Sequence, residues 1–498
     1  MDFCAVKKEN SKKELWIGFL LFFVSIIMNY LILIKNYHNW GGDFSQYISQ
    51  AMALVNNNIE GWYENSKFIV NNSIEALSPS VYPWGYPIML SLVYKVFGFN
   101  INYFKLVNVF LYSVYIFVFF LWLCKRIDTK NSVIISIFFI VNIKLLLYQN
   151  NILSDIPAMT FTMISVYIFD YYFANNGSLV PGLLLGISSF MCYFIRTQSI
   201  IVIASLGFVL CLYFIINCKS IDLNQIIRLC TPFFTFCILY IVTKAILIQD
   251  TSKYISLFGN FSLIKSANNC ISYCEQIMNF FSREHILMHF SENGVMNRMI
   301  CLLYDGFFIV LIISIIVGIH KVYRKDFYVI TLLIFTIMML LIYPYCDIRF
   351  MFGIFFIMVY LSYMGFSNLF RKTKIIYYLC TIFFIGVMIF NVLHIGNRIM
   401  SNMKNNSLFQ SDNAESIYAN ELYNYVINSE EKGVYYFFKP RVLYLYTGEL
   451  AYYKENEIGS ARYVIDYLPS SSLLIEKAVI NKKCIFRNEY FRIYDMNS

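Results

Sequence analysis

Long apolar runs separated by short polar segments dominate the first 395 residues of the chain. About eleven of them approach or reach the length of roughly 17 to 25 residues with which an α-helix crosses a membrane. These runs are 15–34, 106–123, 132–148, 157–173, 179–195, 199–217, 229–249, 301–319, 327–345, 350–370 and 375–395. Strands with open edges cannot satisfy their backbone groups in lipid. The pattern therefore predicts an all-α polytopic membrane bundle over residues 1–395.

The pattern changes in two regions outside these runs. Between the first two runs, residues 43–56 have a helical amphipathic period, and residues 88–98 form an apolar stretch too short to cross a membrane. We interpret both as helices of a first outer loop, lying at the membrane interface. After residue 395, short strand-like and helical stretches alternate, at 414–428, 433–438, 463–467, 473–478 and a hairpin within 484–494. They predict a small α/β domain over residues 396–498.

Basic residues form short clusters between the apolar runs, such as Lys125 with Arg126 and Arg324 with Lys325. Their alternation predicts a cytoplasmic N-terminus and an extracytoplasmic C-terminal domain. The net charge of +9 is not gathered into one stripe, so no nucleic-acid partner is expected. Only 14% of residues are charged, against about 25% in soluble proteins. Lipid is the expected solvent of the bundle, and the chain is expected to be an integral membrane protein.

Asp43 is the first candidate for chemistry, because it follows two glycines at the start of the helix predicted over 43–56. One interpretation makes it the N-cap of that helix, with Gln46 completing a capping box. Another makes it a general base held at the membrane surface. The two interpretations are compatible, since a capping carboxylate is also rigidly placed.

Several further motifs follow Asp43 in order. They are Asp43, Tyr47 and Ala51 in D-x-x-x-Y-x-x-x-A spacing, Y-P-W-G-Y-P at 82–87, Phe97-Gly98, Ser154-Asp155-Ile156-Pro157, Phe194-Ile195-Arg196-Thr197, Arg349-Phe350 and the segment 439–448. This order resembles the GT-C superfamily of membrane glycosyltransferases. It is particularly similar to bacterial relatives of dolichyl-phosphate-mannose protein mannosyltransferase (glycosyltransferase family 39) and of lipid A aminoarabinose transferase.

The resemblance implies an enzyme that transfers a sugar from a polyprenyl-phosphate donor to an extracytoplasmic lipid, glycan or protein, with inversion, in a bacterial cytoplasmic membrane. It makes Asp43 the base and Asp155 a second acidic or orienting residue, with the donor phosphate at Arg196 and Arg349. The donor and acceptor groove would be lined by Tyr47, Tyr82, Trp84 and Tyr86. No metal ligand is assigned. A divalent metal stays open as a cofactor, because Phe44 stands where the family commonly has a second charged residue.

Simpler interpretations exist for the same residues. Arg196 and Arg349 fit interfacial anchors, and Asp155 fits a helix N-cap. A polysaccharide polymerase or ligase, or a transporter or flippase of lipid-linked sugars, is the alternative function. The long first loop argues against the polymerase, and the absence of an internal repeat argues against the transporter.

Two residue pairs lie within the polar loop 250–300, where a short helix is expected. His285 and His289 stand four residues apart, as in a metal-binding pair or on a plain surface helix. Cys270 and Cys274 are the one pair with the spacing for a local disulfide.

Overall fold

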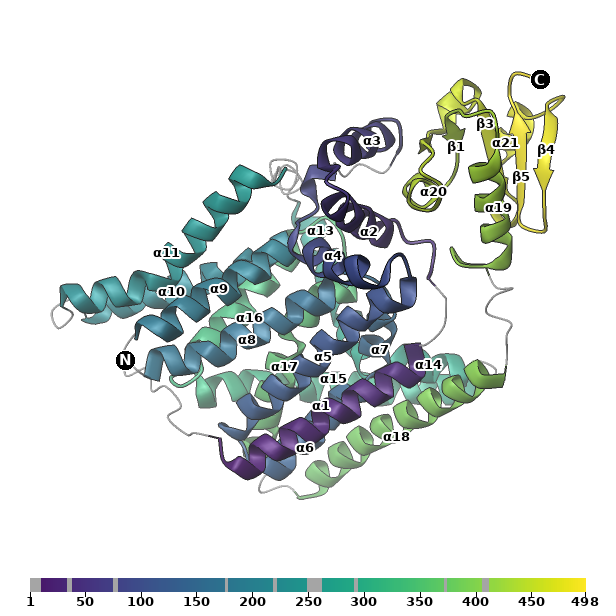
Figure 1. Ribbon diagram of the computed structural model, residues 1–498. Coiled ribbons are helices and arrows are strands. Elements are labelled where there is room, and N and C mark those ends of the chain that lie inside the picture. The colour runs from purple at the N-terminus through teal and green to yellow at the C-terminus, as the bar shows by residue number, and fades with distance from the viewer. Residues whose placement is uncertain are drawn as a thin grey trace.

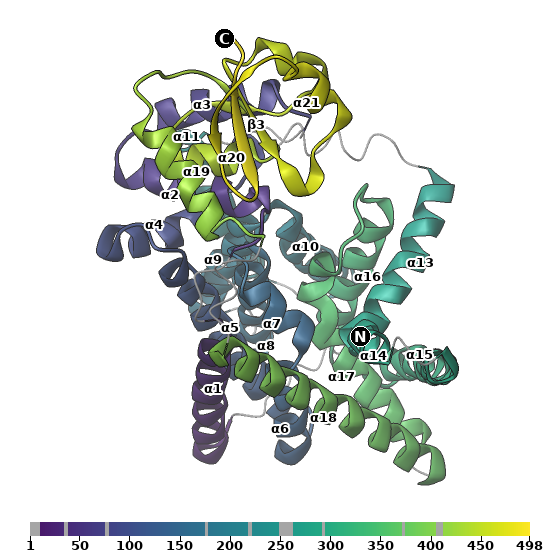
Figure 2. The same cartoon turned by 90° about the vertical axis from the view of Figure 1, so that its right-hand side faces the viewer.

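In the computed structural model, a helical bundle carries the first outer loop and the C-terminal domain together at one end (Figures 1 and 2). The structure describes residues 10–33, 38–74, 79–174, 178–217, 222–248, 262–290, 294–370, 374–404 and 412–498. Within these residues the predicted division into membrane bundle, outer loop and small mixed domain is recognisable.

Each predicted apolar run coincides with helix. The bundle helices are α1 (Lys12–Leu33), α5 (Ile101–Cys124), α6 (Thr129–Ile140), α7 (Ile143–Gln149), α8 (Asp155–Ala174), α9 (Leu179–Ile195), α10 (Ile200–Asn217), α11 (Leu223–Ile246), α15 (Gly294–Val322), α16 (Phe327–Ile342), α17 (Phe352–Leu369) and α18 (Lys374–Lys404). Among the described residues, seven helices are long and apolar enough to span a membrane, or eight if the bent pair α6 and α7 counts as one span. The polytopic bundle is confirmed, while the number of eleven crossings stays a prediction.

The bend between α6 and α7 has a local cause. The two helices meet at 53°. Asn142 lies at the break, where its side-chain oxygen accepts the Leu145 N–H at 3.2 Å and its amide donates to the Phe280 carbonyl at 2.9 Å. This side chain caps α7 and ties the break to a neighbouring helix, so the interrupted backbone groups are satisfied inside the bundle.

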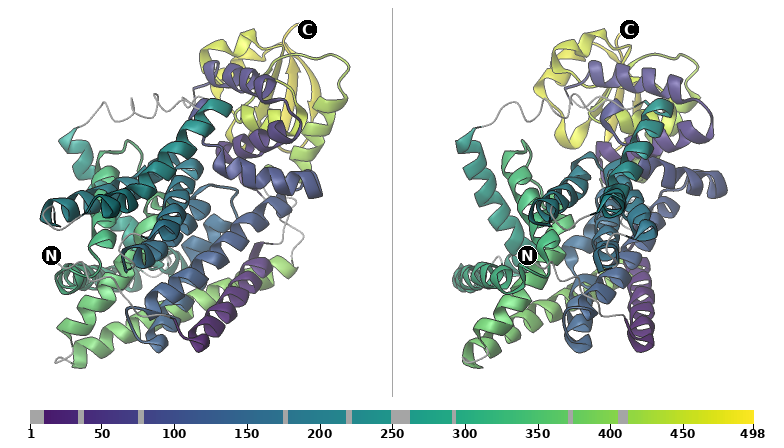
Figure 3. Two further views of the ribbon diagram at one scale, coloured as in Figure 1. Left: turned by 60° about the vertical axis from the view of Figure 1, so that its left-hand side comes forward. Right: turned by 90° about the vertical axis from the view of Figure 1, so that its left-hand side faces the viewer.

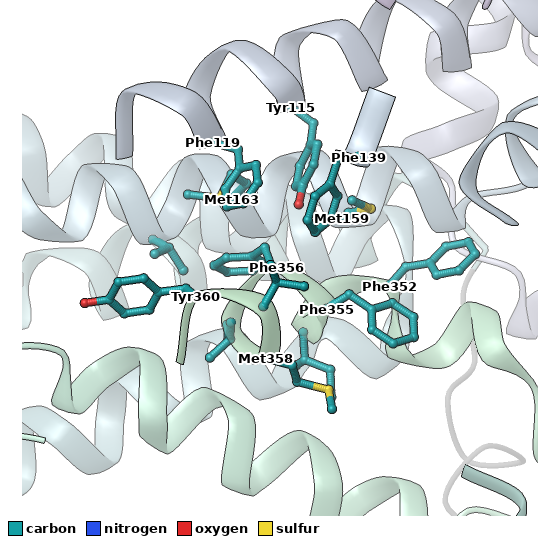
Figure 4. Packing of buried hydrophobic residues seen from close by; sticks show 14 of the residues in the cluster. Tyr115, Phe119, Phe139, Met159, Met163, Phe352, Phe355, Phe356, Met358 and Tyr360 are labelled. Atoms are coloured by element: carbon teal, nitrogen blue, oxygen red, sulfur yellow. The ribbon is translucent and has the colours of Figure 1, made fainter. Parts of the chain in front are cut away.

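The centre of the bundle is packed with aromatic and methionine side chains from α5, α6, α8 and α17 (Figure 4). Phe119 and Phe139 meet edge to face with ring centroids 4.9 Å apart. Helices α15 and α17 lie in close contact at Gly365 of α17. A Cβ on Gly365 would lie 1.8 Å from the Ser314 carbonyl oxygen, so this crossing requires glycine.

The first outer loop folds into α2 (Gly42–Val55), α3 (Ile59–Asn71), a 3₁₀ turn η1 (Pro79–Val81) and α4 (Gly85–Phe97). Helix α2 confirms the predicted helix over 43–56. Helix α4 buries Leu90 and exposes Leu92 and Val96, which are 65% and 72% accessible. An apolar face left open beside the bundle is the arrangement expected of an interfacial helix.

The polar loop before α15 contains α13 (Leu263–Phe280) and α14 (Arg283–His289). Helix α14 carries both His285 and His289, in agreement with the short helix expected there. Cys270 and Cys274 both lie on α13 as free thiols.

The C-terminal domain is a five-stranded sheet with helices beside it. Its elements are α19 (Ile417–Asn428), β1 (Tyr435–Tyr436), α20 (Pro440–Thr447), β2 (Ala451–Tyr452), η6 (Glu455–Ser460), β3 (Tyr463–Tyr467), η7 (Leu468–Ser470), α21 (Leu473–Ala478), β4 (Lys483–Arg487) and β5 (Phe491–Asp495). The strand order is β2-β1-β3-β5-β4, with β1 parallel to β2 and β3, and β5 antiparallel to β3 and β4. The predicted α/β character and the β4–β5 hairpin are confirmed.

The boundary between the two domains was predicted at 395/396. This position lies inside α18, which continues to Lys404. The described part of the C-terminal domain begins at Asp412. The division into residues 1–395 and 396–498 stays a prediction.

Candidate active site

Asp43 lies in the first turn of α2. Gly41 is the N-cap and no side chain caps this end, so the capping interpretation of Asp43 is wrong. The Tyr82 hydroxyl donates to Asp43 Oδ1 at 2.8 Å, and Arg349 Nη1 donates to Oδ2 at 3.2 Å. The Asp43 side chain is 35% exposed. The carboxylate is therefore fixed by two hydrogen-bond partners and still accessible to a further group from solution.

Arg349 belongs to the 3₁₀ turn η4 (Ile348–Met351), which leads into α17. Its Nε lies 3.1 Å from Asp347 Oδ2, and its backbone N–H donates to Asp347 Oδ1 at 3.0 Å. The Tyr148 hydroxyl donates to the same Oδ1 at 2.9 Å. Asp347 thus caps η4 and holds the arginine that reaches Asp43. The site has a third carboxylate that the sequence motifs did not indicate.

Arg196 follows α9 and begins the turn η2 (Thr197–Ser199). Its Nη1 forms an ion pair with Asp155, the first residue of α8, whose side chain is 2% exposed. Its Nε donates to Gln198 Oε1 at 3.1 Å. Phe350 lies between the two arginines, with its ring centroid 5.1 Å from Arg196 Cζ and 5.3 Å from Arg349 Cζ. The two guanidinium groups therefore flank one aromatic ring, as in a cation–π arrangement.

A cavity of about 50 Å³ lies between α8, α10, α16 and α17. At about 10–15 Å³ for each water-sized probe, this is room for a few water molecules or one small anion. Its charged and amide lining consists of Asp155, Arg196, Gln198 and Arg349, and its hydroxyl lining of Thr162, Ser199 and Thr336. Its apolar lining includes Met159, Val202, Leu332, Met339 and Ile354. Gln198 Nε2 is buried and makes no protein hydrogen bond. The cavity thus offers two guanidinium groups and a free amide donor beside an apolar wall.

The four predicted aromatic groove residues divide into two pairs. Tyr47 and Tyr82 adjoin Asp43, with ring centroids 5.6 Å apart, and the Tyr47 hydroxyl shares a hydrogen bond with Ser154 at 2.9 Å. Burial raises the pKa of Tyr82 well above its ordinary value, and the neighbouring Asp43 carboxylate adds to this effect. Tyr82 therefore keeps its proton and acts as a hydrogen-bond donor to Asp43.

Trp84 and Tyr86 lie elsewhere than predicted. Both side chains have no accessible surface, so they do not line a groove. The Trp84 indole donates to the Ile248 carbonyl at 2.8 Å, and the Tyr86 hydroxyl donates to Asn108 Oδ1 at 3.0 Å. These two aromatic residues support the outer loop from behind.

Gly85, between these two aromatic residues, packs closely against the backbone of the bundle. A Cβ at this position would lie 2.6 Å from the Phe194 carbonyl oxygen. Because Phe194 is two residues before Arg196, the start of α4 rests on the backbone that leads into the arginine turn.

Four residues of the site were missed by sequence reasoning: Asp347, Tyr148, Gln198 and Arg441. Asp347 and Gln198 each lie two positions from a predicted arginine. A polar side chain this close to a predicted site residue is the sequence signal that could have identified them. Tyr148 and Arg441 are brought to the site only by tertiary packing. The guanidinium of Arg441, in the C-terminal domain, donates to the Tyr82 hydroxyl at 3.1 Å.

A divalent metal stays open as a cofactor. Among the described residues, no three His, Cys, Asp or Glu side chains are grouped as metal ligands, and this includes His285 and His289. Asp155 pairs with Arg196, while Asp43 and Asp347 share Arg349. Three carboxylates beside two arginines leave one negative charge in excess at this end of the bundle.

The fold is that of the GT-C glycosyltransferases, a polytopic helical bundle with a C-terminal domain. ArnT from Cupriavidus metallidurans, a lipid A aminoarabinose transferase solved bound to undecaprenyl phosphate, superimposes with a TM-score of 0.55 at 9% identity, over 97% of this chain and 98% of that one. Its apo structure gives 0.56 at 10% identity, with 98% of each chain covered. An Archaeoglobus fulgidus oligosaccharyltransferase, solved in complex with Zn and sulfate, gives 0.57 at 10% identity, over 91% of this chain and 68% of that one. By sequence, no family model and no curated protein matches the chain.

Proposed function

We propose that the protein is a membrane glycosyltransferase that moves a sugar from a polyprenyl-phosphate donor to an acceptor outside the cytoplasm. The observation that carries the proposal is the cavity flanked by Arg196 and Arg349, with the Asp43 carboxylate held at its edge through Arg349. An anion site and a base, side by side, are the two elements that such a transfer requires.

On the donor side, the phosphate lies between Arg196 and Arg349 and takes a third hydrogen bond from Gln198 Nε2. The prenyl chain follows the apolar wall of the cavity between α10 and α16. Guanidinium groups suit this task because they donate in a planar fork to phosphate oxygens. They stabilise the negative charge that builds on the phosphate as the bond from the anomeric carbon to the phosphate oxygen breaks.

On the acceptor side, Asp43 takes the proton of the attacking hydroxyl group. The acceptor oxygen forms its bond to the anomeric carbon on the face opposite the departing phosphate, so the configuration is inverted. Tyr82 holds Oδ1 of the carboxylate in place. Oδ2 is paired with Arg349 at 3.2 Å, and a donor phosphate that binds Arg349 weakens this pair and leaves Oδ2 available as the base.

Asp155 supports the same reaction indirectly, because it orients Arg196 toward the cavity. The acceptor belongs to the envelope lipids, glycans or proteins that reach the outer side of a bacterial cytoplasmic membrane. In this orientation the N-terminus is cytoplasmic, and a reporter fused after Ser498 is expected to be active only on the outer side.

The test is a transfer assay with purified protein in nanodiscs, a panel of undecaprenyl-phosphate hexoses and pentoses, and envelope extract as the source of acceptors. The readout is release of undecaprenyl phosphate. Asp43→Asn keeps the shape of the side chain but removes the base, so we expect turnover to fall at least about 10²-fold with unfolding unchanged. Asp222→Asn is the matched control, because Asp222 caps α11 and asparagine caps a helix equally well.

Near wild-type turnover of Asp43→Asn would remove Asp43 from the mechanism. In a parallel assay in proteoliposomes, movement of the labelled donor across the membrane without release of undecaprenyl phosphate would instead identify a transporter. Release without dependence on either arginine would contradict the proposed donor site.

A further inference from the structure

The C-terminal domain contacts the outer loop through α20, which lies against α2 and α3 (Figure 3). Arg441, the second residue of α20, is 8% exposed and reaches across this contact. Its Nη1 donates to the Tyr82 hydroxyl oxygen at 3.1 Å, and its Cζ lies 5.3 Å from the centroid of the Tyr82 ring. The same hydroxyl donates to Asp43 Oδ1 at 2.8 Å. A side chain of the C-terminal domain is thus one residue away from the proposed base.

The direction of these hydrogen bonds is set by the chemistry of the groups. Arginine only donates, and a hydroxyl has one hydrogen and two acceptor positions. With Arg441 on the oxygen of Tyr82, the tyrosine hydrogen is directed to Asp43.

The contact is held by the local fold of α20. Pro440 stands at the start of this helix and Gly448 ends it with φ +77°, so both ends are conformationally fixed. One turn after Arg441, the Tyr444 hydroxyl accepts a hydrogen bond from Asn65 of α3 at 3.0 Å. Arg441 is therefore presented by a rigid helix that is attached to the outer loop at a second point.

We propose that Arg441 is a positioning residue of the active site, supplied by the C-terminal domain to fix Tyr82 and, through it, Asp43. The inference rests on the proposed function and extends it, because it makes the C-terminal domain a part of the catalytic machinery. Its alternative is that Arg441 only holds the two domains together.

A double-mutant cycle separates these two roles, because a residue that acts through Tyr82 loses its effect when the tyrosine hydroxyl is gone. The variants are Arg441→Gln, Tyr82→Phe and the combination, assayed in nanodiscs by release of undecaprenyl phosphate. We expect Arg441→Gln to lower kcat about ten-fold in the native background and less than about two-fold in the Tyr82→Phe background. Binding of undecaprenyl phosphate alone should stay within about two-fold, because Arg441 is not on the donor side.

Two further measurements sharpen the cycle. Arg441→Lys keeps the charge and should retain more activity than Arg441→Gln. Arg462→Gln, at an arginine of the same domain that pairs with Glu431 and Asp495, should leave kcat unchanged.

Equal losses in both tyrosine backgrounds would show a structural role and overturn the inference, as would wild-type kcat in Arg441→Gln. If Arg441→Gln does not fold, the cycle is run with Arg441→Lys, and the criterion is that its loss of kcat becomes smaller in the Tyr82→Phe background. A wild-type protein that neither binds undecaprenyl phosphate nor releases it from any donor would contradict the proposed function itself. Active wild-type protein with independent losses would overturn only the role of Arg441.

Discussion

Two clusters of arginine and aspartate lie at opposite ends of the bundle. The outer site contains Arg196 and Arg349 with Asp43, Asp155 and Asp347. The inner cluster joins Arg126, after α5, to Asp170 of α8 and Asp326 before α16, and the Tyr360 hydroxyl of α17 donates to Asp326 at 2.6 Å. Both clusters have more carboxylates than arginines, so residue type alone does not separate a binding site from a structural one.

The exposure of the arginines and the lengths of their contacts do distinguish Arg349 of the outer site from Arg126 of the inner cluster. In the inner cluster, Arg126 and Asp326 are 3% and 1% exposed, and hydrogen bonds of 2.8 to 2.9 Å use all three guanidinium nitrogens. In the outer site, Arg349 is 26% exposed, its contacts with Asp43 and Asp347 are 3.2 and 3.1 Å long, and it borders a cavity. An arginine with loose, partly exposed partners can change them for a ligand, whereas a saturated buried one cannot.

The largest effect is expected from a substitution that breaks the inner cluster. Arg126→Met leaves two buried aspartates without their cation, and removal of one partner from a buried ion pair typically costs about 3–5 kcal/mol. We expect a loss of that size in the free energy of unfolding, measured with denaturant in detergent. Arg324→Met, at an exposed arginine of the same end, is the control. An equal effect of both variants would contradict a structural role for Arg126.

In the outer site, the corresponding change should affect binding more than folding. Arg349→Gln removes a charged donor, and hydrogen bonds to charged groups contribute about 1.5–3 kcal/mol, which is roughly a 10- to 150-fold rise in Kd. The measurement is binding of undecaprenyl phosphate to protein in nanodiscs. Arg462→Gln, in the C-terminal domain, should leave the Kd unchanged. If Arg349→Gln lowered the free energy of unfolding as much as Arg126→Met, the distinction between a structural inner cluster and a binding outer site would be lost.

A pH dependence of stability should also arise at the outer end, from His38. Burial lowers the pKa of His38 from 6.5 to about 3. Its Nε2 accepts a hydrogen bond from the Ile152 N–H at 3.1 Å. Protonation of Nε2 would place its new N–H against the Ile152 N–H and break this hydrogen bond. Because the pKa is depressed in the folded state, the stabilisation is present above pH 6.5 and is lost as the pH falls toward 3. At pH 5.5 the loss is on the order of 1 kcal/mol.

The measurement for His38 is the free energy of unfolding at pH 7.5 and pH 5.5. His38→Gln keeps an acceptor for the Ile152 N–H without titrating, so this variant should lose the pH dependence assigned to His38. The same slope in wild type and variant would show that other groups cause it.

The smallest expected effect concerns Gln198. Its Nε2 is a neutral donor, and such hydrogen bonds contribute about 0.5–1.5 kcal/mol. Gln198→Leu should therefore weaken undecaprenyl phosphate binding by a few-fold, and Gln198→Glu should weaken it more because it repels the phosphate. Tighter binding to Gln198→Glu would exclude a phosphate from this end of the cavity.

The bundle was predictable because hydropathy is a local property of the chain. Strand β3 was also predictable, since a run of aromatic and β-branched residues is a local signal, and all five of its residues are buried. Helix α21 was predicted at its observed bounds, and the structure adds that Ser472 caps it. The site was only partly predictable. Asp43, Asp155, Arg196 and Arg349 could be named from ordered motifs, but their pairing needed the packing of α2, α8, α9 and η4.

The misses have physical reasons. The family resemblance implied that Trp84 and Tyr86 line a groove, but both side chains are fully buried and each has a hydrogen-bond partner that allows this burial. Asp43 was expected to cap α2, but Gly41 occupies that position and frees the carboxylate. Arg441 is more than 350 positions from its partner Tyr82, so no local pattern connects the two.

Gly85 sets how accurately the two halves of the site are spaced. The proposed donor arginine and the proposed base belong to different segments, and a side chain between these segments would act as a compliant spacer. At Gly85 the two segments instead lie backbone against backbone, because a Cβ added there would be only 2.6 Å from the Phe194 carbonyl oxygen. Alanine at this position would therefore push the outer loop away from the turn that begins at Arg196 and change the distance between the proposed base and the proposed donor site.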